Sequence, residues 1–142
     1  MRILTVLLLG LALTAPSFAE KRVIAPKGSP SGRPFSPGIL ADGTLYVSGM
    51  VGNDAAGKIP ENFDAEVRQC LDNIGAVLKE AAMGFQDAVA VQVYLTDIEL
   101  FQRMNAVYTT YFKEPRPART TVGVTKLAAP AARIEITVTA RK

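Results

Sequence analysis

The order in which helix-period and strand-period segments alternate is the feature that most constrains this fold. Apolar residues recur at threes and fours over 62–83, and again between Asp97 and Pro115, as in helices that bury one face. Strands are expected at 21–25, 43–52, 87–95, 119–127 and 133–140. The predicted order is β, β, α, β, α, β, β. We expect a mixed α/β fold (α+β), in which one sheet has both helices packed on a single face.

The other face of this sheet is expected to be small and threonine-rich, with few long charged side chains. Alternate residues of the last two strands should point to it, because side chains alternate between faces along a strand. The residues placed there are Arg119, Thr121, Gly123, Thr125, Glu135, Thr137 and Thr139. A solvated face usually carries more lysine and glutamate. We therefore expect it to pack against another copy of the chain, the alternative being an ordinary solvated sheet.

The first nineteen residues are typical of a secretory signal peptide. A basic start at Arg2 precedes an apolar run over 3–13, and Ser17 and Ala19 are small residues at the positions that precede a cut before Glu20. The run is shorter than the roughly 20 residues of a permanent span, although an uncleaved anchor is the alternative. We expect export to the periplasm or outside the cell, no stable membrane insertion after cleavage, and one domain over 20–142.

Composition excludes several kinds of chemistry. The sequence has no histidine and one cysteine, Cys70, which rules out an imidazole base, a histidine-ligated metal and an internal disulfide. Cys70 falls in the apolar stripe of the first helix, where a packed core thiol is expected. Loss of Arg2 with the leader would lower the formal net charge from +3 to +2. So small a charge does not predict nucleic-acid binding.

Arg119 and Glu135 are the residues best suited to chemistry. The two prolines of "PRPAR" restrict the backbone before Arg119, whose planar guanidinium can bind a carboxylate through two parallel hydrogen bonds. Glu135 lies between two isoleucines in the last strand and could activate a water molecule. Both are expected on neighbouring strands and on the same polar face. The alternative is a structural salt bridge between them that closes a subunit contact.

Two weaker signals accompany this pair. Ser48 and Gly49 end a predicted strand, and a glycine there often marks a bulge or a close approach of the backbone to a ligand. Asn105 lies on the second helix, one position away from the apolar stripe, and by itself would be a surface asparagine.

Taken together, "RPFSPGILADGTLYVSGMVG", "VQVYLTDIELFQRMNAVYTTYF", "PRPARTTVGVTKL" and "RIEITV" resemble the RidA family, also called YjgF/YER057c/UK114, over about residues 30–140. The resemblance implies a chorismate-mutase-like fold and a homotrimer with sites at the subunit interfaces. It also implies hydrolysis of enamines and imines, such as 2-iminobutanoate and 2-iminopropanoate, to 2-keto acids and ammonia. No metal or organic cofactor is expected.

The resemblance also implies roles for individual residues. Arg119 matches the arginine that binds the substrate carboxylate, and Glu135 matches the glutamate near the attacking water. The positions that match the pocket wall are Ser48, Gly49, Asn105 and Thr121. Phe35 stands at a further wall position, where typical members have a tyrosine, so one hydroxyl is missing.

Three other functions stay open beside the deaminase. Phe35 and the predicted leader keep open a non-catalytic module that binds a small carboxylic acid at the same interface. An RNase or translation inhibitor, a label used in the family, fits poorly with the balanced charge and the lack of histidine. A holdase chaperone has also been suggested within the family, and the sequence offers no test of it.

Overall fold

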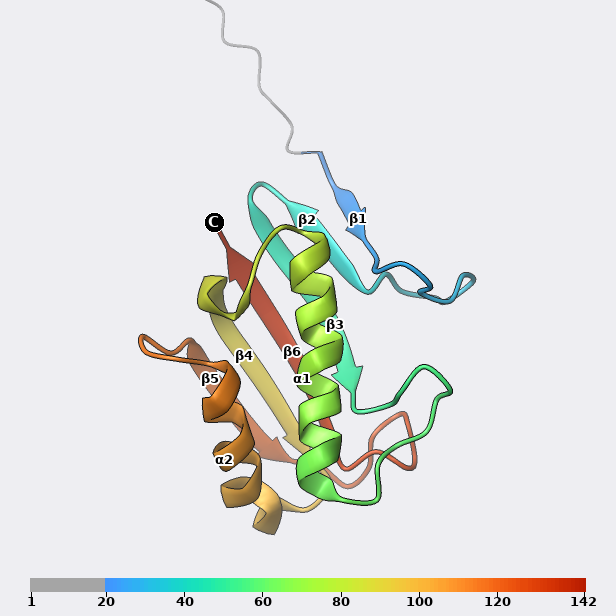
Figure 1. Cartoon of the computed structure of the whole chain (residues 1–142), viewed down its shortest axis with the longest axis vertical. Helices are drawn as coiled ribbons and strands as arrows, with labels where there is room; N and C mark the ends of the chain where they lie inside the picture. Colours follow the sequence, from blue (N-terminus) through green and yellow to red (C-terminus); the bar gives the residue numbers. More distant parts are fainter. Residues whose placement is uncertain (1–19) are drawn as a thin grey trace, which may run out of the picture.

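The computed structural model describes residues 20–142, which form one six-stranded sheet with two helices (Figure 1). The predicted leader lies outside the described residues. The strands follow one another across the sheet in the order β1, β2, β3, β6, β4, β5, and only β4 and β5 are parallel neighbours. The elements are β1 (Arg22–Ile24), β2 (Gly38–Ala41), β3 (Thr44–Val51), α1 (Phe63–Glu80), β4 (Ala88–Leu95), α2 (Phe101–Tyr111), β5 (Ala118–Gly123) and β6 (Ile134–Arg141), with 3-10 turns at Phe85–Asp87 and Ile98–Leu100.

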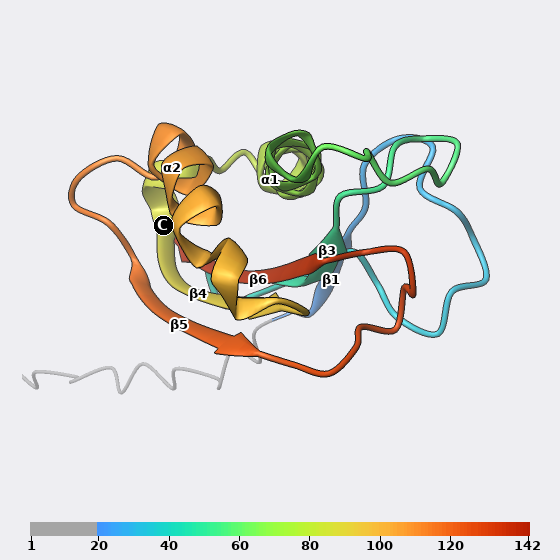
Figure 2. The same ribbon diagram turned by 90° about the horizontal axis from the view of Figure 1, so that it is seen from below.

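Both helices cover the same face of the sheet, as predicted (Figure 2). The side chain of Asn62 caps α1 by accepting a hydrogen bond from the backbone N–H of Ala65 at 3.0 Å. The core lies between the helices and the sheet, and Cys70 belongs to it as expected. The residues that α1 buries there are Phe63, Glu66, Val67, Cys70, Leu71, Ile74, Val77 and Leu78.

Strand β2 is absent from the predicted order. It has four residues and pairs with β3 across the turn at Asp42 and Gly43, whose φ angles of 48° and 70° are those of a tight hairpin turn. Four residues are too few to show a period. Among residues 20–142, the structure contains no helix with the length and hydropathy needed to span a membrane.

The prediction that Arg119 and Glu135 lie on neighbouring strands is wrong. Strand β4 separates β5 from β6, with Val91 paired to Arg119 on one side and to Val138 on the other. The physical reason is the β4–α2–β5 connection, a crossover that returns the chain parallel to β4 rather than beside β6.

The assignment of β5 to the two faces was also wrong. Arg119 and Thr121 are in register with Val91 and Val93, both buried beneath the helices, so they point to the helix-covered face. Glu135 is in register with Tyr94, whose side chain points the other way. Since β5 carries β-branched residues on both faces, its period of two does not show which face is inside.

The face that the helices leave uncovered, here called the open face, is partly apolar. Glu135, Thr137 and Thr139 lie on it, as predicted. Two large apolar side chains join them, since Tyr46 is paired with Thr139 and Val122 is paired with Tyr94. Tyr46 is 54% exposed and Val122 is 40% exposed.

Candidate active site

The side chain of Arg119 lies under α2, against two aromatic rings. Its guanidinium carbon is 4.5 Å from the centre of the Tyr108 ring and 5.6 Å from that of Phe101. A guanidinium over an aromatic face is held electrostatically and keeps its N–H donors at the edge of its plane. A cavity of about 390 Å³, here called the Arg119 cavity, opens beside it. Its lining residues are Asn105, Tyr108, Thr109, Arg116, Pro117 and Arg119.

Arg119 forms no ion pair with any of residues 20–142. The salt bridges in that part of the chain join Arg103 to Asp64, Arg116 to Glu114, and Arg133 to Glu66. The hydroxyl of Tyr108 is buried beside Arg119 and has no hydrogen-bond partner among residues 20–142. Its burial raises the pKa of Tyr108, against the lowering effect of Arg119. The Arg119 cavity therefore offers unused donors and positive charge, which suit a carboxylate.

Asn105 and Thr121 are placed differently with respect to this cavity. Asn105 lines it from α2, one turn before Thr109, whose hydroxyl donates to the Asn105 carbonyl at 3.1 Å. Thr121 points to the same face of the sheet as Arg119, and its hydroxyl is buried without a partner in the described chain. It is not one of the residues that line the Arg119 cavity.

Glu135 lines a second cavity, of about 340 Å³, here called the Glu135 cavity. A side chain on Gly49 would meet the carboxylate directly, because a Cβ atom built there would lie 1.9 Å from Oε1 of Glu135. The β-bulge expected at Ser48 and Gly49 is present, as a register shift between Val47 and Met50. The lining residues are Phe35, Ser48, Gly49, Val51, Ala128, Ala129 and Glu135.

Ser48 fixes the loop that carries Phe35. Its hydroxyl donates to the carbonyl of Ser36 at 2.6 Å, and its backbone N–H donates to the carbonyl of Pro37 at 2.9 Å. These two bonds hold the aromatic ring of Phe35, 50% exposed, at the wall of the Glu135 cavity. Three of the predicted wall residues, Phe35, Ser48 and Gly49, are thus brought together with Glu135.

One chain does not bring Arg119 and Glu135 together. They point to opposite faces of the sheet and lie two strands and three residues apart, roughly 14 Å between Cα atoms from standard strand spacings. The alternative of a salt bridge between them is therefore not formed within a chain. The predicted residues fall into two half-sites, with Arg119 and Asn105 on one side of the sheet and the Glu135 group on the other.

Four residues that line these cavities were not predicted as site residues: Tyr108, Arg116, Ala128 and Ala129. Tyr108 lies in the buried stripe of α2, within the apolar period expected between Asp97 and Pro115, and its ring lies beneath Arg119. Arg116 stands in the same "PRPAR" segment as Arg119 and could have been flagged with it. Within residues 20–142, no cluster of three or more His, Cys, Asp and Glu side chains is arranged to hold a metal ion.

Comparisons with known proteins show which family this chain belongs to. The family model described as Endoribonuclease L-PSP matches residues 27–142. A RutC family protein of Saccharolobus solfataricus is 42% identical over 130 residues, which cover 88% of this chain and 95% of that protein. The 2-iminobutanoate/2-iminopropanoate deaminase of Homo sapiens is 38% identical over 119 residues, covering 82% of this chain and 86% of the human protein.

Solved structures agree with this placement. The crystal structure of a Rid family protein, YyfA of Yersinia pestis, superposes with a TM-score of 0.81 at 35% identity, covering 87% of this chain and 100% of the other. That of the YjgF gene product of E. coli gives a TM-score of 0.78 at 29% identity, covering 85% and 98%. Since the family model and these relatives extend over most of the chain, this protein belongs to the RidA (YjgF/YER057c/UK114) family.

Proposed function

We propose that this protein is an imine deaminase that hydrolyses 2-imino acids and their enamine tautomers to 2-keto acids and ammonia. The observation that carries the proposal is the guanidinium of Arg119, stacked on Tyr108 at the edge of a cavity and free of any carboxylate of residues 20–142. Relatives at 37–38% identity support it, since the human, goat and cattle proteins are named 2-iminobutanoate/2-iminopropanoate deaminases.

The reaction needs positioning more than activation, because an imine carbon is already electrophilic. Arg119 would bind the substrate carboxylate through two hydrogen bonds and so fix the imine carbon. Glu135 would accept a proton from a water molecule as its oxygen bonds to that carbon, while the C=N π pair moves to nitrogen, which takes this proton and gives the carbinolamine. The hydroxyl proton then passes through Glu135 to the amine, the C–N bond breaks to release ammonia, and the C–O bond becomes the carbonyl of the 2-keto acid. Oxidation states do not change, so no redox partner is required.

The two halves of this site would come from two copies of the chain. Arg119 and Glu135 diverge from opposite faces of one sheet, and the open face that carries Glu135 also exposes Tyr46 and Val122. Apolar side chains on a sheet face without a covering layer favour contact with another protein surface. We propose a homotrimer in which the Arg119 half-site of one subunit faces the Glu135 half-site of the next.

A binding module for small carboxylic acids is the second candidate. Phe35 favours it, because the phenyl ring at the wall of the Glu135 cavity has no hydroxyl to donate to a substrate or water. A nuclease, as the description of the family model suggests, is less well supported by a chain with no histidine and a formal net charge of +3.

The experiment that separates these functions generates 2-imino acids in situ with an amino-acid oxidase and follows their decay with and without the protein. Acceleration that is lost in Arg119→Ala supports the deaminase. Arg103→Ala is the matched control, because Arg103 pairs with Asp64 on the surface and lines none of the site cavities. Binding of 2-oxobutanoate without any acceleration would support the binding module instead.

We also propose that the protein acts outside the cytoplasm, after removal of residues 1–19. The basic start, short apolar run and small residues before Glu20 support this. Mass spectrometry of the protein purified from its native host tests the proposal. A mature N-terminus at Glu20 supports it, whereas an intact N-terminus in the cytoplasmic fraction contradicts it.

A further inference from the structure

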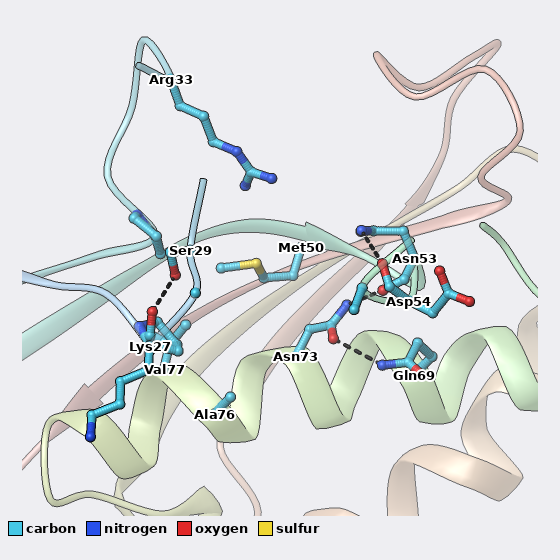
Figure 3. A pocket seen from close by; sticks show the side chains of 14 residues that line it. Lys27, Ser29, Arg33, Met50, Asn53, Asp54, Gln69, Asn73, Ala76 and Val77 are labelled. Carbon is cyan, nitrogen blue, oxygen red and sulfur yellow. Dashed lines mark hydrogen bonds between the residues drawn. The ribbon is translucent and has the colours of Figure 1, made fainter. Parts of the chain in front are cut away.

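A third cavity, of about 340 Å³, lies between α1 and the loop over 26–37 (Figure 3). We propose that this cavity, here called the Arg33 cavity, binds a small carboxylic acid with a short apolar chain, and that its occupation adjusts the position of Phe35 in the Glu135 cavity. It shares no lining residue with the Arg119 or Glu135 cavities. Because helix α1 forms one wall, it opens on the helix side of the sheet and would stay accessible when the open face is covered.

The charged groups of the Arg33 cavity suit an anion. Arg33 and Lys27 both line it, and neither forms a salt bridge with any residue of the described chain. Figure 3 shows the Arg33 side chain reaching from the loop into the space above Met50. The lining holds one carboxylate, that of Asp54, whose Oδ1 accepts the backbone N–H groups of Ala56 and Lys58, each at 2.9 Å.

The amide groups on the other side of the cavity are already partly used. The side-chain nitrogen of Asn73 donates to the carbonyls of Val51 and Asn53, both at 2.9 Å, and its oxygen accepts from Gln69 at 3.0 Å. These bonds fix the wall that α1 presents to the cavity. Arg33 is therefore the group best able to bind the charged end of a ligand, since the side chain of Lys27 runs away from the space that Arg33 enters (Figure 3).

Much of the remaining surface of the cavity is apolar. Met50, from β3, lies at the base of the space in Figure 3, and Ala76 and Val77 line it from α1. A small inorganic anion would leave this surface in contact with water, whereas a carboxylic acid with a short hydrocarbon chain would cover it. The volume is ample for an acid of a few carbon atoms.

The Arg33 cavity is linked to the Glu135 cavity by one direct contact. The guanidinium carbon of Arg33 is 5.7 Å from the centre of the Phe35 ring, and Phe35 lines the Glu135 cavity. A carboxylate that binds Arg33 competes with this cation–π contact and so changes the position or freedom of the ring. The binding claim is independent of the proposed deaminase reaction, whereas an effect on its rate rests on that function.

Binding is tested by nuclear magnetic resonance on ¹⁵N-labelled Arg119→Ala protein, in which the other carboxylate site is disabled. The probe is 4-methyl-2-oxopentanoate, titrated at constant ionic strength. We expect saturable shifts of the backbone amides of Gly28, Ser29, Asn53 and Ala76, with a Kd on the order of 1 mM. Acetate, which lacks the chain, should bind several-fold more weakly.

Two further variants on the same background make the test specific. Arg33→Ala should weaken binding at least tenfold, whereas Arg22→Ala, which removes an exposed arginine that lines none of the site cavities, should leave it unchanged. An absence of saturable shifts, equal binding in Arg33→Ala, or equal affinity for acetate would overturn the site. The amides of Phe35 and Ser48 should shift together with the cavity residues, and their failure to move would overturn the link to the Glu135 cavity.

Discussion

The carboxylate of Glu66 is wholly buried and bound by Arg133 through both of its oxygens. Oε1 accepts the backbone N–H of Arg133 and Oε2 accepts its side-chain Nε, each at 2.6 Å. Nη2 of Arg133 donates in turn to the carbonyls of Pro60 and Glu61, at 2.9 and 3.0 Å. This pair joins the first turns of α1 to Arg133, which directly precedes β6 and lies two residues before Glu135. It therefore fixes the segment that carries the candidate glutamate.

Replacing Glu66 by alanine should lower the free energy of unfolding by about 3–5 kcal/mol, because it leaves the N–H groups of Arg133 without their buried acceptor. Glu66→Gln should cost less, since an amide oxygen can still accept one of the two bonds. Urea unfolding at fixed protein concentration measures both. A loss below about 1 kcal/mol in the alanine variant would show that the pair does not hold this segment.

Gly49→Ala should displace the carboxylate of Glu135, since the new methyl group would occupy the place of Oε1. If Glu135 orients the water, we expect kcat to fall about 100-fold with little change in thermal stability. The control is Gly123→Ala, where a Cβ atom would make only ordinary contacts, with Ile98 at 3.5 Å and the Leu95 carbonyl at 4.0 Å. Unchanged kcat in Gly49→Ala would argue against a role for the glutamate in catalysis.

Tyr108→Phe tests whether the buried hydroxyl beside Arg119 serves a ligand. The hydroxyl has no hydrogen-bond partner in the described chain, so its removal should leave the free energy of unfolding unchanged or slightly raised. If it binds the substrate carboxylate together with Arg119, kcat/KM should fall about tenfold. A variant that is destabilised but fully active would instead assign the hydroxyl to the fold.

As the pH rises above about 8.5, the free energy of unfolding should fall more steeply in the wild type than in Cys70→Ala. Complete burial raises the pKa of the Cys70 thiol above its ordinary value, so the folded chain keeps a proton that the unfolded chain loses above about pH 8.5. The thiol's contribution is present below that pH and declines above it, by up to about 1.4 kcal/mol per pH unit. Denaturant unfolding at about pH 8 and pH 10 measures it, and parallel slopes in the two proteins would contradict it.

Much of this fold could be predicted because its signals are local and repeated. The apolar stripe of α1, the cap at Asn62 and the bulge at Ser48 and Gly49 each depend on a few neighbouring residues. Which side chains of β5 point toward the helices could not be predicted in the same way. Its threonines and valine suit either face, and its neighbour is decided by the crossover through α2, so Arg119 was assigned to the wrong side.

Six of the seven residues named from the sequence lie at cavities, Thr121 being the exception, and their roles in a site stay a prediction. Arg119, Glu135, Phe35, Ser48, Gly49 and Asn105 all line cavities. That these are two cavities on opposite faces depends on strand order, which residue spacing does not record. Glu66 was missed because a glutamate in a helix is usually exposed, and its burial follows from a partner 67 residues away along the chain.

The claim that one subunit supplies Arg119 and another supplies Glu135 is tested most directly by hybrid assemblies. Arg119→Ala and Glu135→Gln chains, each inactive alone, are co-expressed with different tags, and assemblies that carry both tags are isolated. A hybrid trimer contains two chains of one variant and one chain of the other. In both cases, one of its three interfaces pairs an intact Arg119 with an intact Glu135, so about one third of wild-type activity should return. Hybrids as inactive as their parents would contradict a site shared between subunits.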